Sequence, residues 1–414
     1  MKLSTRIRGS GALRVLPFAL VLVFFYYGTN DYADDGLGHA PTAVSDALGM
    51  IYGFAYAVAS GLGVWESGRL RATGLWRLAP GRSRFRVAGS ALLPVLLLSW
   101  LMLVLPVAAA LLVSGVPPTP ASLLPLLMAL LLCAAHASIG FGVGLRTPPL
   151  ITAPLMSVFV LILVTFSWTV EPTWVRHLFG QYPTTLMFGE RASVLSLVPH
   201  LSLTGGIAAA LWLLWLPWRP VLPRVAVALV ASLAAVAGSW AMVRTWDFNP
   251  PLVTASAPVR CAGEEPRVCM PRVTASRLPE TRAELVSVLA DFRVAGVAYA
   301  PDVITDSMND GRFPVSSTES RWHIPLTAIA NRGNSRYQLA LASVRFTCGR
   351  PDPVTRHAVR AWVARVTGEE IGHRGTTSSA RRAEREIDRV NALPREQQAQ
   401  WFRESLAEGC GKGG

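Results

Sequence analysis

Residues 91–113 read ALLPVLLLSWLMLVLPVAAALLV, an uninterrupted run without a single Asp, Glu, Lys, Arg or His. A helix needs roughly 20 mostly apolar residues to cross the hydrocarbon core of a bilayer, and this run is long enough. Two further runs, 150–170 and 225–243, are equally free of charge. A helix that is apolar on every side needs a large core or a membrane around it, and a chain of 414 residues builds no such core. The sequence therefore predicts membrane-spanning helices.

The composition separates a membrane part from a water-exposed part. The chain is 51% apolar and 16% charged, with a mean hydropathy of +0.37, whereas soluble proteins average about 25% charged residues. Residues 1–244 hold 16 Lys and Arg and 7 Asp and Glu, and 245–414 hold 23 and 19. We expect an α-helical polytopic membrane bundle over 1–244, followed by a small α+β extracytoplasmic domain over 245–414. About seven spans are predicted, at 15–28, 45–65, 91–113, 121–145, 150–170, 201–217 and 225–243.

Arginines gather in alternate connections between these spans. Segment 66–90 carries six arginines against the single acid Glu66, whereas 28–44 has three Asp and no base. Basic loops stay in the cytoplasm, so the N-terminus is predicted inside and the C-terminal domain outside. Only two of the 39 basic residues are lysine, which is typical of a GC-rich bacterial genome, so we expect a bacterial cytoplasmic membrane. A cleaved signal peptide over 1–30 is disfavoured because no small-x-small cleavage pattern follows its apolar core.

The cysteines are distributed in a way that agrees with this topology. Cys133 lies within a predicted span, and the other four all lie in the segment assigned outside: Cys261, Cys269, Cys348 and Cys410. An even number of cysteines in an oxidising compartment predicts two disulfides, with three possible connectivities. Pairing Cys261 with Cys269 would close a short loop, and pairing Cys348 with Cys410 would tie down the tail. The alternative is four unpaired thiols.

The most informative polar stretch is Trp65–Arg86, WESGRLRATGLWRLAPGRSRFR. Arginines alternate with large apolar residues, which is typical of a short amphipathic helix lying in the membrane interface. Pro80-Gly81 would end that helix. The alternative is an ordinary positive-inside loop.

The order of elements around this stretch resembles the permease subunits of ABC-type exporters of the type-two family. In that family a glutamate ends the second span and an amphipathic coupling helix follows. The resemblance covers roughly 1–217 and implies half-inserted helices in 171–200, an ATPase on a separate chain and a second permease chain in a homo- or heterodimer. It assigns ATPase coupling to segment 66–86, and the residues concerned are Glu66, Arg69, Arg71, Gly74, Leu75, Trp76, Leu78, Pro80 and Arg82. The seventh span and the exported domain depart from the simplest members. The chain has no G-x-x-x-x-G-K-[ST] motif, so ATP would bind to the partner.

Small residues recur at four-residue spacing in two predicted spans, and such stripes let helix backbones approach closely. The members are Gly49, Gly53, Ala57 and Gly61 in the second span and Gly140 and Gly144 in the fourth. They are read as packing surfaces within the chain, with subunit contacts as the alternative. The spans offer few ionisable groups, chiefly His136 and, at an edge, Asp46, which disfavours a proton-coupled transporter. An export path for a lipid-like, peptide or other amphiphilic substrate needs no such charges.

The C-terminal region mixes helix and strand signals. Helices are predicted after a capping box at Thr281-Arg-Ala-Glu284, over 353–367, and as a pair over 378–408 broken near Leu393-Pro394. Short strands are predicted at 267–273, 295–304 and 321–325, and 336–348 suits either state.

This region carries no pattern for a catalytic, cofactor or metal site. His323, His357 and His373 are scattered, a metal site at Glu369–His373 is disfavoured, and no G-x-S-x-G elbow occurs. Nothing suggests nucleic acid, and the expected partners are the ATPase, a second permease chain and membrane lipid. Two rival hypotheses remain: a non-transporting, membrane-anchored sensor or binding protein that uses the exported domain, and a membrane-bound hydrolase.

Overall fold

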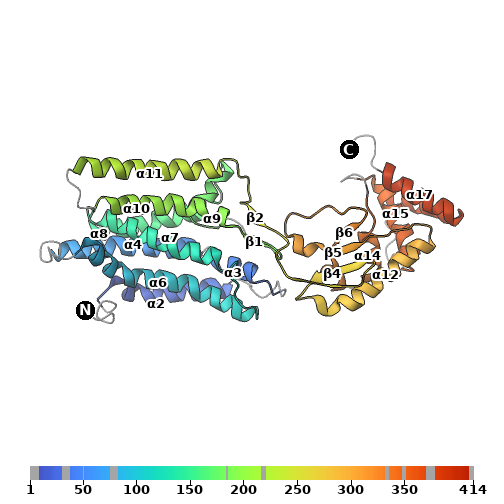
Figure 1. Ribbon diagram of the computed structural model, residues 1–414, viewed down its shortest axis with the longest axis horizontal. Coiled ribbons are helices and arrows are strands. Elements are labelled where there is room, and N and C mark those ends of the chain that lie inside the picture. The colour runs from blue at the N-terminus through green and yellow to red at the C-terminus, as the bar shows by residue number, and fades with distance from the viewer. Residues whose placement is uncertain are drawn as a thin grey trace. The chain divides into compact units, whose positions relative to one another are not determined.

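The computed structural model describes residues 9–29, 38–49, 51–74, 83–182, 185–215, 221–331, 335–346, 351–369 and 378–409. It divides into two compact units, Met1–Thr254 and Ala255–Gly414, whose elements are labelled in Figure 1. The sequence placed the boundary after residue 244. Strand β2 (Leu252–Val253) pairs antiparallel with β1 (Arg191–Ala192). This pairing keeps residues 245–254 with the first unit.

Among the described residues of the first unit, the regular elements other than β1 and β2 are helices. Its helices are α2 (Gly11–Thr29), α3 (Ala40–Leu48), α4 (Ile51–Ala72), α6 (Arg84–Val113), α7 (Leu124–Gly144), α8 (Pro149–Phe166), the 3-10 helix η1 (Thr173–His177), α9 (Val194–His200), the π-helical turn η2 (Leu201–Gly205), α10 (Gly206–Leu213) and α11 (Val221–Val243). Six helical stretches among the described residues are long and apolar enough to cross a membrane. A seventh is reached only if α3 and α4, which meet at a bend of 51°, form one broken span.

The spans differ from the predicted ones mainly at their ends. Helix α6 begins at Arg84 rather than near 91, and its 30 residues extend about 45 Å, longer than the hydrocarbon core. The sixth span begins at Val194 rather than 201, because Ser193 caps it by accepting a hydrogen bond from the Ser196 amide. Residues 194–200 thus belong to a span. The rest of 171–200, as far as it is described, holds only η1 and β1 as regular elements, with no pair of half-inserted helices.

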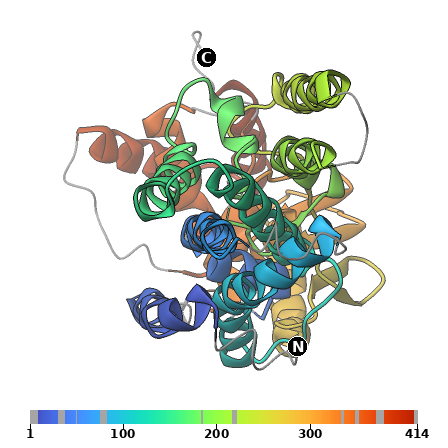
Figure 2. The ribbon, with the colours of Figure 1, turned by 90° about the vertical axis from the view of Figure 1, so that its left-hand side faces the viewer.

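Helix α4 is the hub of the first unit. It packs most extensively against α7 and α8, and also against α6, α2 and α3. Figure 2 shows these helices nearly end-on. The buried core includes Tyr52 and Tyr56 of α4, Met102 of α6 and Phe141 of α7. A movement of α4 would therefore be transmitted to most of the bundle.

The second unit contains a four-stranded sheet in the order β3-β4-β5-β6. Its strands are β3 (Val259–Ala262), β4 (Arg267–Pro271), β5 (Val303–Asp306) and β6 (Arg321–Ile324). The β3–β4 pair is antiparallel, and β5 is parallel to both β4 and β6. Its helices are η3 (Ala275–Arg277), α12 (Leu278–Val294), η4 (Ser307–Asp310), α13 (Leu326–Ala330), α14 (Ser335–Ala342), α15 (Pro353–Val366), α16 (Ser378–Asn391) and α17 (Arg395–Glu408). The unit has its own core, in which Phe292, Trp362 and Phe402 pack together.

Several local predictions for this unit need correction. Thr281 is buried inside α12 rather than capping it, because the helix starts earlier with Pro279 in its first turn. Strand β5 begins at 303, eight residues later than predicted, and β3 was not predicted. The ambiguous stretch 336–348 forms helix α14 over most of its described part.

Candidate functional site

The last turns of α4 carry a buried carboxylate that holds another helix in place. Glu66 is nearly fully buried, and its Oε1 accepts a hydrogen bond of 2.6 Å from the amide of Gly11. Arg69, one turn later, donates to both carboxylate oxygens at 3.0–3.1 Å. Gly11 is the first residue of α2, where amides have no partner within the helix and a negative charge is favoured. Glu66 thus joins the start of α2 to the end of α4.

Arg71 binds a different part of the bundle. Its guanidinium donates to the carbonyl of Leu145 at 3.3 Å and to that of Thr147 at 2.7 Å. Both carbonyls belong to the connection between α7 and α8. The six residues from Glu66 to Arg71 therefore tie the end of α4 to the α7–α8 connection as well as to α2.

The described chain leaves α4 just beyond these contacts. The amide of Gly74 donates to the carbonyl of Arg71 at 3.0 Å, and Gly74 has a φ of +63°, which suits a glycine after a helix end. Its described continuation resumes at Ser83. The other residues assigned to coupling, Leu75, Trp76, Leu78, Pro80 and Arg82, lie outside the described residues.

The small residues lie on two faces of α4. On one face, a Cβ at Gly53 would come within 2.7 Å of Thr165 Oγ1, and the carbonyl of Ala57 accepts a hydrogen bond of 3.0 Å from Ser157, both on α8. Gly61 approaches Ser157 on the same helix.

The other face meets α7, where Gly140 approaches the backbone of Ser60 and Gly144 approaches that of Val64. Gly49 ends α3 and faces Tyr26 of α2, so it does not continue the stripe of α4. All six predicted packing residues thus contact other parts of this chain.

Sequence reasoning missed a group of buried polar side chains near η1. The guanidinium carbon of Arg176 lies 3.9 Å from the centroid of the Phe248 ring. Its Nε and Nη1 have no hydrogen-bond partner among the described residues. His177 hydrogen bonds to the carbonyl of Asp247 at 2.9 Å. Burial lowers the pKa of His177, the Asp247 carbonyl opposes this, and the Arg176 guanidinium lowers it further. The only signal in the sequence is an Arg-His pair between two spans.

A second buried contact ties the loop after η1 to the hub helix. Tyr56 donates to the carbonyl of Gly180 at 2.9 Å, and the amide of Gly180 donates to His200 Nδ1 at 2.9 Å. His136 stacks on Tyr56 with 4.9 Å between ring centroids, and its two nitrogens have no partner within the described part of the chain. Tyr56, His136 and His200 thus connect α4, α7 and α9 around Gly180.

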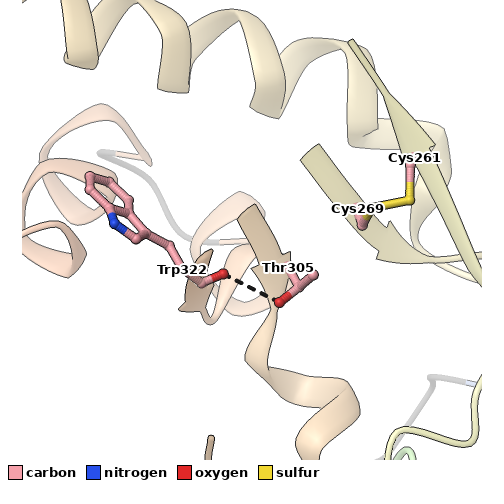
Figure 3. Close-up of a disulfide and its surroundings, with 4 residues drawn as sticks. All are labelled: Cys261, Cys269, Thr305 and Trp322. Atoms are coloured by element: carbon pink, nitrogen blue, oxygen red, sulfur yellow. Dashed lines mark hydrogen bonds between the residues drawn. A yellow bond between two sulfur atoms is a disulfide. The ribbon is translucent and has the colours of Figure 1, made fainter. Parts of the chain in front are cut away.

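In the second unit a row of side chains crosses the sheet. Cys261 and Cys269 are paired positions of β3 and β4 and form a disulfide, the short-loop pairing considered above (Figure 3). Thr305 of β5 is the register partner of Cys269, and His323 of β6 is the register partner of Thr305. The Thr305 hydroxyl donates to the carbonyl of Trp322 at 3.3 Å (Figure 3).

His323 also pairs with a carboxylate, which the sequence did not predict. Its Nδ1 lies 2.8 Å from Asp310 Oδ2. A general base for a hydroxyl nucleophile would need the other ring nitrogen within hydrogen-bond distance of that hydroxyl. Thr305 Oγ1 instead lies 3.4 Å from the same Nδ1, and Ser317 Oγ bonds to the backbone of His323. The His323–Asp310 pair therefore holds η4 against β6, and the bonds of Ser317 hold the loop before β6.

No group of three metal-ligating side chains occurs among the residues that the structure describes. His357 is exposed, and the Glu370–His373 part of the disfavoured metal site lies outside the described residues. Cys348 and Cys410 also lie outside them. Their described neighbours meet, since the amide of Asp352 donates to the carbonyl of Gly409 at 2.7 Å.

Comparison with known proteins identifies only part of the second unit. Residues 268–409 match the model of a protein family described as a domain of unknown function, DUF7224. No curated protein and no solved structure matches the chain.

Proposed function

We propose that this chain is a permease-like subunit of an ABC-type exporter, driven by an ATPase on a separate chain. The supporting observation is the linkage at the end of α4, where Glu66 holds α2 and Arg71 holds the α7–α8 connection. The coupling segment that follows would receive the movement of the ATPase on the cytoplasmic side. Because α4 also packs against α6, α7 and α8, a displacement of that segment would reach most of the bundle.

The proposal gives each of the three polar side chains a mechanical role. Glu66 and Arg71 join the end of α4 to neighbouring elements by bonds of 2.6 Å and 2.7 Å. Arg69 contacts both oxygens of the same carboxylate and so holds it in place, although solvent screens most of the attraction. In this account the chain performs no chemistry itself, and its substrate is an amphiphile that needs no intramembrane charges.

The test is ATP hydrolysis by the chain reconstituted in lipid with an ABC ATPase subunit from the same genome. Loss of a hydrogen bond to a buried charged group costs about 1.5–3 kcal/mol, so Glu66→Ala, which removes the acceptor of the Gly11 amide, should reduce permease-dependent hydrolysis by roughly tenfold or more. Arg71→Ala should also reduce it. Arg272→Ala, which removes an exposed arginine of the second unit, serves as the control. Unchanged hydrolysis in both α4 variants would contradict the proposal.

A second candidate is a membrane-anchored binding or sensor protein. The observation that favours it is the second unit's own core together with the family match, which falls wholly within that unit. In that case no ATPase would copurify with the chain, and a ligand that protects 255–414 from proteolysis would be expected.

A further inference from the structure

A groove opens on the first unit between α2, α4 and α8. Its volume is about 330 Å³, within the range of pockets that hold small ligands. The walls include Arg14 and Val15 of α2, Val58 and Gly61 of α4, and Ser157 of α8. The groove is therefore built from three of the membrane helices.

The chemistry of the walls selects an apolar occupant. Ser157, the polar side chain on the α8 wall, already donates its hydroxyl to the carbonyl of Ala57. Water in this space would find few polar partners, and a buried water normally makes about three hydrogen bonds. Gly61 deepens the groove, because any side chain there would collide with Ser157. Exposed apolar side chains such as Phe18 and Leu155 lie on two of the same helices, as expected for a surface that faces lipid tails.

One charge lies among these walls. Arg14 is exposed, and its guanidinium has no hydrogen-bond or ionic partner among the residues that the structure describes. It lies in the first turn of α2, beside the end of α4 that carries Trp65. Tryptophan and arginine are both typical of the headgroup level of a membrane. A molecule with its tail in the groove would therefore bring its headgroup to a cation.

We propose that this groove is a binding site for one anionic phospholipid, with an acyl chain between α2, α4 and α8 and its phosphate at Arg14. The bound lipid would pack against Gly11, whose amide is held by Glu66, and so would stabilise the α2–α4 contact. The groove lies beside the α2–α4 linkage used in the proposed function, but its evidence is its own lining and Arg14, and lipid binding there does not require an ATPase.

The experiment reconstitutes the full chain in vesicles of phosphatidylethanolamine and phosphatidylglycerol, extracts it in mild detergent, and counts the retained lipids by native mass spectrometry. One arginine near the membrane surface attracts an anionic headgroup by about fivefold, so Arg14→Gln should lower the retained ratio of phosphatidylglycerol to phosphatidylethanolamine by that factor. Arg146→Gln, in the connection between α7 and α8, removes an exposed charge that does not line the groove and should leave the ratio unchanged.

Filling the groove tests the tail contact separately. Val58→Trp should abolish retention of both lipids, whereas Val236→Trp, on the exposed face of α11, should retain them. Val15→Trp fills the groove from α2 and replaces the first variant if that one fails to fold. An equal headgroup ratio in the wild type and Arg14→Gln, or full lipid retention in a folded groove-filling variant, would overturn the proposal. ATP hydrolysis is not measured, so the outcome is independent of the proposed function.

Discussion

Replacing Glu66 by Ala should release the start of α2 from α4. The first four amides of a helix have no partner within it, so the protection of the Gly11 amide depends on the 2.6 Å bond to Glu66. Losing a hydrogen bond to a buried charged group costs about 1.5–3 kcal/mol. Losing a negative charge at the N-terminus of α2 costs up to about 1 kcal/mol more. The contact with half-exposed Arg69 adds little because solvent screens it.

The expected loss is therefore about 2–4 kcal/mol for Glu66→Ala, because the terms for the hydrogen bond and the helix dipole add. An energy of 1.4 kcal/mol corresponds to a factor of ten, so the Gly11 amide should exchange its hydrogen roughly 30- to 700-fold faster. Glu66→Gln keeps one oxygen that can accept the same bond, and its effect should be about fivefold, the equivalent of about 1 kcal/mol.

The assay is hydrogen exchange with mass-spectrometric fragmentation that resolves Gly11 from Arg14. Arg69→Gln is the control, because it removes the exposed partner of Glu66 and keeps the Gly11 bond. Its effect should stay within about fivefold. If Gly11 exchanges in the Ala variant at the wild-type rate, Glu66 does not hold α2 and the linkage described above fails.

Three further changes test other parts of the fold. Gly140→Ala should destabilise the first unit by about 1–3 kcal/mol, because the added Cβ would collide with the backbone of Ser60. Gly142→Ala is the control, since its Cβ would meet only ordinary contacts and the stability should not change. Thermal unfolding in detergent compares the two variants. Replacing Cys261 and Cys269 by Ser should cost the second unit about 2–3 kcal/mol, measured by denaturant unfolding of the full chain; an unchanged midpoint would contradict this. Burial lowers the pKa of His39 to about 4, against the attraction of Glu190, so the folded state binds its proton less readily than the unfolded state. Thermal stability should then fall as the pH drops from about 6.5 towards 4, and this dependence should flatten in His39→Gln.

The membrane helices could be predicted because length and hydropathy alone decide them. Runs such as 91–113 and 225–243 contain no charge, and each lies within a helix of the structure. The ends of helices are decided by local polar contacts instead. The capping of the sixth span by Ser193 and the charged start of α6 at Arg84 leave no hydropathy signal.

The candidate site was predictable only in part. Glu66 stood out as the single acid of a basic segment, but its contact with Gly11 joins positions 55 residues apart and has no local pattern. The pairing of His323 with Asp310 likewise depends on how η4 and β6 come together. The family resemblance assigned coupling to a segment whose later residues lie outside the described chain, and its ATPase partner remains a prediction.

Thiol labelling in intact bacterial cells tests most directly the topology on which the proposed function depends. Single cysteines would be placed at the exposed positions Thr73, Pro117 and Ser316 in a background without the native cysteines. A membrane-impermeant maleimide should label positions 117 and 316 in intact cells, and position 73 only after the membrane is permeabilised. Labelling of position 73 in intact cells, with 316 protected, would place the arginine-rich segment outside and remove the basis for ATPase coupling.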